Sequence, residues 1–356
     1  SSNRFGGIDK MKAAVFKTAG SPLVVETVPD PTPEPNDLVL KVGACGICGT
    51  DLHMSENTDA TVGWRGLPPE CVMGHEFAGE VVEVGREAKG DWRTGDRVTA
   101  LPWIGCGECA LCRSGRGFRC ASAKMRASHK LPGAYAEYCR VGAFESFRLP
   151  STVSFQEGAM VEPLAVGLNA VRRAGLRPGD SVLIVGAGPV GLSVALWCRF
   201  FGAQHIVVSD LVEVRAERAL SMGATSAVDA RHDDVMEHVE AVIGARPEIV
   251  FDAVGVPGSL QLAIDYAAHD GRLVVVGLCM AGDHLFPTKA LVKELDIRFA
   301  FIYPQADFAK VLELLGLGRI DAKPMISDCI GLGEFSDAFE ALKQPNQQIK
   351  VMLEPN

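Results

Sequence analysis

The feature that most constrains the fold is a glycine-rich turn, Gly186 to Gly191, which stands between two apolar segments. Residues 181–185 precede it as a short apolar run, typical of a central parallel strand, and an apolar helix follows at 192–201. In the spacing G-x-G-x-x-G, Gly186 makes the tight turn, Gly188 admits a pyrophosphate, and Gly191 lets strand and helix pack. The start of the helix, with Pro189 and Val190, then faces the phosphates. We therefore expect a dinucleotide to bind at this turn.

The segment after the turn keeps alternating between strand and helix patterns. Apolar strands are expected at 205–209, 226–228, 248–252 and 272–277, and helices at 235–243 and 259–268. This order predicts a doubly wound parallel sheet of the α/β class. Asp210 ends the second strand, where an acid accepts hydrogen bonds from the adenosine ribose and repels a 2′-phosphate, so NAD is favoured over NADP. Asp210 also suits a cap for the helix that begins near Val212, and we count Arg215 among the cofactor-binding residues.

A second group of chemically active side chains lies between residues 43 and 76. Cys48 is followed by Thr50, Asp51 and His53, and His75-Glu76 comes later. A thiolate, an imidazole and a carboxylate can hold Zn²⁺ with one position left open, as in catalytic sites. Taken singly, Cys48 also suits a small buried position and His75 an ordinary loop.

Glu162 is a third candidate, because it lies in an apolar segment directly before a proline. A buried carboxylate needs a partner. A metal, bound directly or through its water, is one such partner, so Glu162 joins the candidate metal ligands.

Four cysteines within fifteen residues predict a second metal site. They are Cys106, Cys109, Cys112 and Cys120. A closed set of four thiolates is typical of a structural zinc that holds together a lobe poor in apolar residues. One alternative is four free thiols, but these would be exposed to oxidation. The other is a zinc ribbon that binds nucleic acid, and the net charge of −9 argues against it.

Size and composition set the remaining bounds. The 356 residues allow two domains, and 47 % hydrophobic and 22 % charged residues are ordinary for a soluble globular protein. No apolar run is long enough to span a bilayer, and residues 1–10 lack the apolar segment of a signal peptide. Eleven cysteines without an export signal suggest a cytoplasmic protein that uses its thiolates for metal. We expect no nucleic-acid or membrane partner.

Together these motifs resemble the zinc-dependent medium-chain dehydrogenase/reductase family. Gly74-His75-Glu76 with Gly79 and Gly85 is similar to the family's zinc motif, and the four cysteines and the glycine-rich turn match as well. Glu162-Pro163-Leu164 resembles the branch of sorbitol, butanediol and threonine dehydrogenases, whereas classical alcohol dehydrogenases carry cysteine at that position. The resemblance implies a β-rich, GroES-like catalytic domain and a Rossmann NAD-binding domain. The expected limits are 11–163 and 298–356 for the catalytic domain, with a structural-zinc lobe near 104–122, and 164–297 for the Rossmann domain.

The resemblance also implies roles for single residues. Cys48, His75 and a glutamate, either Glu76 or Glu162, would hold the catalytic zinc. Thr50 and His53 match the proton relay, Asp51 matches a supporting carboxylate, and Lys350 matches a basic residue that meets the cofactor phosphates. The expected cofactors are therefore two zinc ions per chain and NAD, and the expected assembly is a homotetramer or a homodimer.

The expected activity is the reversible oxidation of a secondary alcohol to a ketone. Met54 and Ile302 stand where sorbitol enzymes have tyrosine and arginine, so with Trp103 they suit a less polar alcohol, although all three also suit core packing. The alternatives are amino-alcohol oxidation like that of L-threonine 3-dehydrogenase, and an NADP-dependent zinc carbonyl reductase. The remaining alternatives are a zinc-free quinone reductase relative and a non-catalytic redox-sensing module that binds NAD and zinc.

Overall fold

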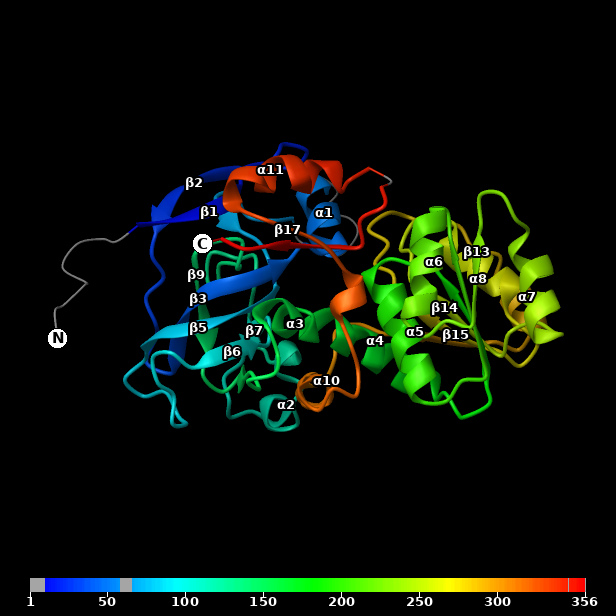
Figure 1. The fold of residues 1–356 in the computed structure, drawn as a ribbon, viewed down its shortest axis with the longest axis horizontal. Helices are drawn as coiled ribbons and strands as arrows, with labels where there is room; N and C mark the ends of the chain where they lie inside the picture. The colour runs from blue at the N-terminus through cyan, green and yellow to red at the C-terminus, as the bar shows by residue number, and fades with distance from the viewer. Residues whose placement is uncertain (1–9, 58–65, 345, 356) are drawn as a thin grey trace.

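The computed structural model describes residues 10–57, 66–344 and 346–355. The expectation that residues 1–10 form no signal peptide concerns a segment of which only residue 10 is described. Two lobes lie side by side in Figure 1. The lobe at the left is rich in strands and includes the carboxyl-terminal end, and the lobe at the right is built from the middle of the chain. In the part of the chain that is described, no helix is long and apolar enough to cross a bilayer.

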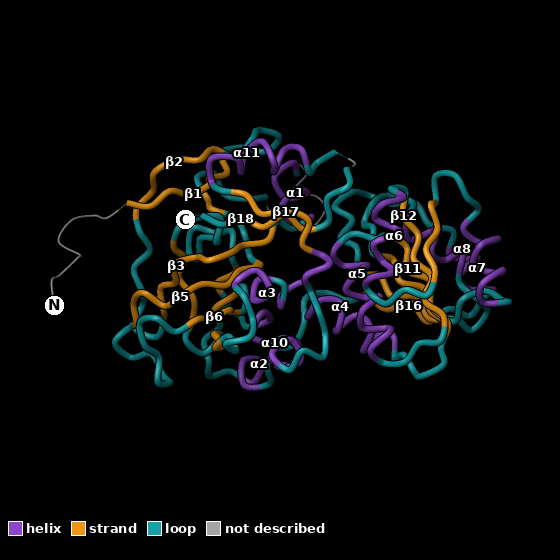
Figure 2. The backbone as a smooth tube through the Cα atoms, in the orientation of Figure 1, coloured by secondary structure: helices purple, strands orange, loops and turns teal. Residues whose placement is uncertain are grey.

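The β-rich lobe brings distant parts of the sequence together in one seven-stranded sheet (Figures 1 and 2). Strand β3 (Asp37–Gly46) pairs antiparallel with β5 (Glu76–Val84), and β18 (Lys350–Leu353) pairs with the end of β3. The same sheet contains β6 (Arg97–Ala100), β9 (Tyr138–Gly142), β10 (Ser146–Arg148) and β17 (Ile326–Ile330). Smaller sheets of the lobe are formed by β1 (Lys10–Phe16), β2 (Val24–Pro29) and β4 (Cys71–Val72), and by β7 (Trp103–Ile104) and β8 (Lys124–Met125).

The other lobe contains the predicted parallel sheet, which confirms the fold class. Its six strands run in the order β13-β12-β11-β14-β15-β16, and each neighbouring pair is parallel. Their bounds are β11 (Ser181–Val185), β12 (His205–Asp210), β13 (Ser226–Asp229), β14 (Ile249–Asp252), β15 (Arg272–Val275) and β16 (Asp296–Phe299). The order of strands reverses between β11 and β14, where ligands bind in sheets of this kind.

Helices connect the strands and join the lobes. In chain order they are α1 (Gly49–Glu56), α2 (Ala110–Arg113), α3 (Phe155–Ala159), α4 (Val161–Ala174), α5 (Pro189–Phe200), α6 (Glu213–Ser221), α7 (Val235–Ile243), α8 (Ser259–Tyr266), α9 (Pro287–Val292), α10 (Gln305–Gly316) and α11 (Leu332–Ala341), with short 3₁₀ turns at Gly117–Arg119 and Lys323–Met325. Helix α4 packs against α5 and α10, and lies between the lobes in Figure 1. One buried apolar cluster includes Trp103 and Phe308 as well as Leu164 and Trp197. The lobes therefore share a core, which holds α4 rigidly.

The strand pairing bears on where one lobe ends and the other begins. Arg298 and Phe299 pair with Val274 and Val275 of β15, so a limit at residue 297 cuts through β16. Helix α4 likewise runs across the expected limit at residue 163. From this pairing we propose that the parallel-sheet lobe ends after Phe299, because β17 and β18 belong to the sheet of the first lobe.

Candidate active site

Three of the predicted metal ligands converge where β3, β5 and α1 meet. Cys48 precedes the first turn of α1, Glu76 begins β5, and His75 directly precedes that strand. The register explains their approach, because Gly46 at the end of β3 lies opposite Glu76. A ligand atom from each of Cys48, His75 and Glu76 lies within 4.8 Å of the others. Sulfur, nitrogen and oxygen donors at this spacing suit a single zinc ion.

Glu76 is held by a lysine from the opposite end of the chain. The Nζ atom of Lys350 donates to both carboxylate oxygens of Glu76, at 2.6 and 2.8 Å, and to the carbonyl oxygen of Ile47 at 2.9 Å. Both side chains are 1 % exposed. A Cβ atom on Gly46 would lie 2.2 Å from Oε2 of Glu76, so the carboxylate needs a glycine there.

This ion pair differs from the role expected for Lys350. An ammonium group has three protons to donate, and those of Lys350 have three acceptors in Glu76 and Ile47. Contact with a cofactor phosphate would require Lys350 to leave at least one of them. The contact of Lys350 with a cofactor phosphate stays a prediction, and the sequence offered no local signal of its pair with Glu76, 274 residues away.

His75 is oriented by a chain of two further side chains. Its Nδ1 atom lies 3.2 Å from Oδ1 of Asp51, and the hydroxyl of Tyr135 donates to Oδ2 of Asp51 at 2.5 Å. Asp51 is 1 % exposed and Tyr135 is fully buried. This contact fixes the imidazole ring and leaves Nε2 as the nitrogen for a metal. Asp51 was expected in this supporting role, whereas Tyr135 was not identified from the sequence.

The electrostatics of the site favour a cation. Burial alone would lower the pKa of His75, but the negative charges of Asp51 and Cys48 outweigh burial and raise the pKa well above 6.5. A cluster of thiolate and carboxylate groups that favours positive charge on its histidine fits a divalent metal. The donor atoms of Cys48, His75 and Glu76 are therefore chemically suited to bind zinc.

Glu162 lies close to this group but has its own partner. It belongs to the first turn of α4, and its Oε1 accepts a hydrogen bond of 2.9 Å from the hydroxyl of Tyr303. Burial raises the pKa of Glu162 to about 7, while the positive charge of His75 and the bond from Tyr303 oppose the shift. Among the residues described, the three-donor group contains Glu76 and not Glu162.

Thr50 and His53 stand on the same short helix as Asp51. Thr50 is half-buried and His53 is exposed. A spacing of three residues places them on the same side of α1. The helix therefore leads from the half-buried Cys48 toward solvent.

The residues expected to line a substrate pocket fall into two classes. Trp103 is 1 % exposed and its ring packs 5.7 Å from that of Tyr303 and 5.5 Å from that of Phe118, so it belongs to the core. Met54 and Ile302 are half-buried. Trp103 is connected to the site through its ring contact with Tyr303.

The four-cysteine group also has the spacing of a metal site. The sulfur atoms of Cys106, Cys109, Cys112 and Cys120 all lie within 4.8 Å of one another. Sγ of Cys106 lies 3.9 Å from Sγ of Cys112, close to the edge of about 3.8 Å expected for a tetrahedron with Zn–S bonds of about 2.3 Å. Backbone N–H groups of Glu108 and Cys109 lower the pKa of Cys106 to about 6, which favours the thiolate that zinc requires.

The glycine-rich turn has the geometry that a dinucleotide requires. Gly186 adopts a φ of 99°, and Gly188 precedes α5, which begins at Pro189. A Cβ on Gly191 would lie 1.8 Å from the carbonyl oxygen of Gly186, so this position admits only glycine. Asp210 closes the turn: its carboxylate accepts from the N–H of Ala187 at 2.7 Å and from that of Val212 at 2.8 Å.

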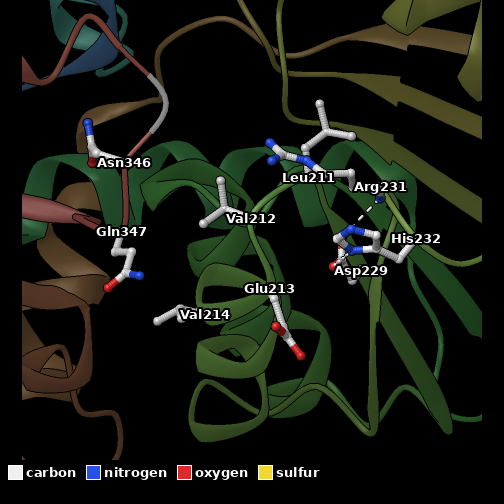
Figure 3. Close-up of a pocket in the computed structure, with 9 residues that line it drawn as sticks. All are labelled: Leu211, Val212, Glu213, Val214, Asp229, Arg231, His232, Asn346 and Gln347. Carbon is white, nitrogen blue, oxygen red and sulfur yellow. Dashed lines mark hydrogen bonds and ion pairs between the residues drawn. The ribbon is translucent and has the colours of Figure 1, made fainter.

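A pocket of about 360 Å³ opens beside Asp210. Figure 3 shows its lining, which comes from the turn after β12, from the end of β13 and, on the opposite side, from Asn346 and Gln347 near the carboxyl terminus. Arg215 donates to Oδ1 of Asn346 at 3.1 Å and so links the two lobes. Its Nε atom is buried and has no acceptor among the described residues. A pocket with an unsatisfied donor nearby suits the hydroxyl groups of a nucleotide.

Comparisons with known proteins agree with this geometry. Residues 34–151 match the alcohol dehydrogenase GroES-like domain, and residues 189–316 match the zinc-binding dehydrogenase domain. Sorbitol dehydrogenase of Bacillus subtilis is 34 % identical over 349 residues, covering 97 % of this chain and 98 % of that protein. L-Threonine 3-dehydrogenase of Aeromonas hydrophila is 35 % identical over 334 residues, covering 92 % and 94 %. A zinc-binding dehydrogenase of Sinorhizobium meliloti, solved with NADP, superposes with a TM-score of 0.86 at 32 % identity, covering 98 % of this chain and all of that one (100 %).

Proposed function

The chain belongs to the zinc-dependent medium-chain dehydrogenase/reductase family, and we propose that it interconverts a secondary alcohol and a ketone with NAD. It is a zinc-dependent alcohol or polyol dehydrogenase that uses a nicotinamide dinucleotide. One observation carries the proposal: Cys48, His75 and Glu76 bring three zinc donors within 4.8 Å of one another. The proposal specifies the substrate class, a secondary alcohol, and the cofactor, NAD.

Cys48, His75 and Glu76 would hold the catalytic zinc. Bound there, the ion would supply Lewis acidity that lowers the pKa of the substrate hydroxyl. We favour Glu76 over Glu162 as the third ligand, because among the described residues Glu76, and not Glu162, has a carboxylate oxygen within 4.8 Å of the donor atoms of both Cys48 and His75. Lys350 would balance the charge of Glu76, and Asp51 would orient His75. The structural zinc would be held by Cys106, Cys109, Cys112 and Cys120.

Thr50 and His53 would carry the substrate proton to solvent. A hydroxyl can both accept and donate a proton, which suits the half-buried Thr50. An exposed imidazole can accept a proton from its neighbour and pass it to water, which suits His53. Their common helix α1 begins next to Cys48, so the path would start at the metal-binding group.

The cofactor would lie along the glycine-rich turn. Its pyrophosphate would meet the N-terminus of α5, and its adenosine ribose would meet Asp210. We infer NAD rather than NADP, because a 2′-phosphate would be repelled by the Asp210 carboxylate. The NADP-bound relative and the arginines near the pocket, Arg215 and Arg231, keep NADP as the second candidate. The ratio of kcat/KM with the two cofactors decides between them.

The substrate would be a secondary alcohol, diol or polyol, in keeping with relatives named for sorbitol. An amino alcohol is the second candidate, because L-threonine 3-dehydrogenases are equally similar to this chain. Met54 and Ile302 would favour the less polar members of these classes. Secondary alcohols, diols, polyols and threonine, assayed at saturating NAD, separate the candidates by kcat/KM.

We also propose a homo-oligomer in a reducing cytosol. Strand β16 is the edge of its sheet, and the side chain of Phe299 is 62 % exposed. On α9, Leu291 and Val292 are 74 % and 62 % exposed. An exposed apolar edge of this kind is suited to pairing with a second copy. None of the eleven cysteines forms a disulfide, as expected in a reducing compartment.

Replacing His75 by alanine tests the catalytic assignment. NADH formation from the preferred alcohol should fall below detection, because no other imidazole belongs to the three-donor group. His129→Ala is a matched control, since His129 lies outside both metal-binding groups and should leave the rate unchanged. Persistent zinc-dependent NADH formation in His75→Ala would overturn the assignment.

A further inference from the structure

Ile302 adopts a backbone conformation that its side chain disfavours. Its φ is +55°, and it is the β-branched member of the five non-glycine residues with positive φ in the described chain. In this left-handed region Cβ crowds the backbone, so a branched residue remains there only where its surroundings hold it. The segment from Phe301 to Tyr303 therefore has to be fixed by contacts from outside.

One such contact comes from Asn169 on α4. Its Nδ2 atom donates to the carbonyl oxygen of Ile302 at 2.6 Å. Asn169 lies seven residues after Glu162 on the same helix, nearly two turns along, so both side chains are on one face. Each is 7 % exposed.

The next residue makes the second contact with that face. Tyr303 is fully buried, and its hydroxyl donates to Oε1 of Glu162 at 2.9 Å. Its ring packs 5.7 Å from that of Trp103 and 5.8 Å from that of Phe308. The ring packing restricts the orientation of Tyr303, and the backbone at Ile302 sets the point from which its side chain projects toward Glu162.

We propose that Asn169 is a positioning residue, which holds the left-handed turn at Ile302 and thereby aims the Tyr303 hydroxyl at Glu162. The two hydrogen bonds attach adjacent residues to one helix face, so a loss of the first displaces the second. With Oε1 engaged by Tyr303, Oε2 is the oxygen of Glu162 that can meet a substrate hydroxyl. This last step rests on the proposed function, whereas the attachment of the turn does not.

A double-mutant cycle between Asn169→Ala and Tyr303→Phe tests the proposal. Asn169→Ala should lower kcat/KM about tenfold, the effect of about one hydrogen bond. In the Tyr303→Phe background the same change should cost less than about twofold, because the hydroxyl that Asn169 aims is already gone. Equal losses in both backgrounds would mean that Asn169 only stabilises the fold, and would overturn the proposal. Asn36→Ala, at an exposed asparagine, is the matched control.

A thermal comparison provides the readout that requires no activity. Glycine adopts positive φ without strain, so Ile302→Gly should relieve more strain in the unmodified chain, where Asn169 holds the turn, than in Asn169→Ala, where the turn can relax. The change in thermal midpoint caused by Ile302→Gly should therefore be more favourable in the unmodified chain than in Asn169→Ala. An equal shift in both backgrounds would contradict the link between Asn169 and the turn. A chain that oxidises no alcohol would overturn the proposed function, while the thermal comparison would still decide the role of Asn169.

Discussion

At the scale of single residues, the two buried glutamates differ in the groups that hold them. Glu76 accepts hydrogen bonds from the ammonium group of Lys350, whereas Glu162 accepts a hydrogen bond from the neutral hydroxyl of Tyr303. A carboxylate paired with an ammonium group remains anionic and suits a metal ligand. Burial raises the pKa of Glu162 to about 7, so near neutral pH this residue has both protonation states available. This difference is the physical ground for preferring Glu76 as the ligand.

Lys350→Met tests the pairing of Glu76. The variant leaves the Glu76 carboxylate buried without a counter-charge, and we expect the metal-free protein to lose about 3 kcal/mol or more of stability. Added zinc should restore part of that loss. Urea unfolding with and without zinc measures both effects. Lys343→Met is the control, because Lys343 pairs with Glu340, whose side chain is 34 % exposed, and should change stability far less. An equal loss in the two variants would contradict the pairing.

Tyr135→Phe tests the chain that orients His75. Removing the hydroxyl leaves Oδ2 of Asp51 without its donor, at a cost of about 1–3 kcal/mol in stability. We expect kcat/KM to fall about tenfold, because residues that support the ligands of metal sites have effects of about this size. Tyr138→Phe is the control, since Tyr138 is only half-buried and lies on β9. An unchanged kcat/KM in Tyr135→Phe would show that Asp51 orients His75 without this hydroxyl.

At the scale of elements, the strands of the parallel sheet were predictable, whereas the long-range pairing within the β-rich lobe was not. The buried strands β11, β12 and β14 each contain a short apolar run, so the local pattern located them within one or two residues. Residues 133–139 also show a strand pattern, but the strand there begins only at Tyr138. Gly133, Ala134 and Tyr135 instead donate to carbonyl groups of the segment before His75. Such pairing depends on long-range contacts, which also explains why Tyr135 and Lys350 were not predicted as partners.

A buried acid beside the four-cysteine lobe links the stability of the protein to pH. Oε1 of Glu145 accepts from the N–H of Gly105 at 2.9 Å. Burial raises the pKa of Glu145 from 4.5 to about 7, against the opposing effect of that N–H. The folded protein therefore binds a proton that the unfolded chain releases between these values. The contribution of the protonated Glu145 carboxyl to the stability of the fold is fully present below pH 4.5 and is lost as the pH rises through about 7.

Glu145→Gln should remove this dependence. The amide keeps an oxygen for Gly105 but has no charge to bury, so the variant should be more stable than the unmodified chain at pH 8 by up to about 3 kcal/mol. At pH 4.5 the difference should vanish. Thermal midpoints at the two pH values measure it, with the exposed Glu313→Gln as control. A gain of the same size at both pH values would contradict the assignment.

At the scale of the whole molecule, the site depends on contacts between lobes. The metal donors come from the first lobe and the glycine-rich turn from the second, and α4 carries Glu162 between them. The motifs in the sequence predicted both halves of this arrangement. The motifs could not predict the contacts between the two lobes, such as the hydrogen bond from Arg215 to Asn346, because no local sequence pattern encodes such contacts.

Phe299→Glu tests the proposed assembly. A charge at the edge of β16 should prevent a second copy from pairing there, so light scattering after gel filtration should show a smaller species than for the unmodified chain. Phe144→Glu is the matched control, because Phe144 is 54 % exposed but lies in the other lobe. A monomeric unmodified chain, or an unchanged assembly in Phe299→Glu, would contradict the proposal.

The number of zinc ions bound per chain tests the central claim most directly. Elemental analysis of the purified protein should give two zinc ions per chain. In His75→Ala it should give one, retained by the four cysteines, and NADH formation should be lost with the other ion. Two zinc ions retained by His75→Ala, or one ion in the unmodified chain with full activity, would contradict a catalytic zinc at Cys48, His75 and Glu76.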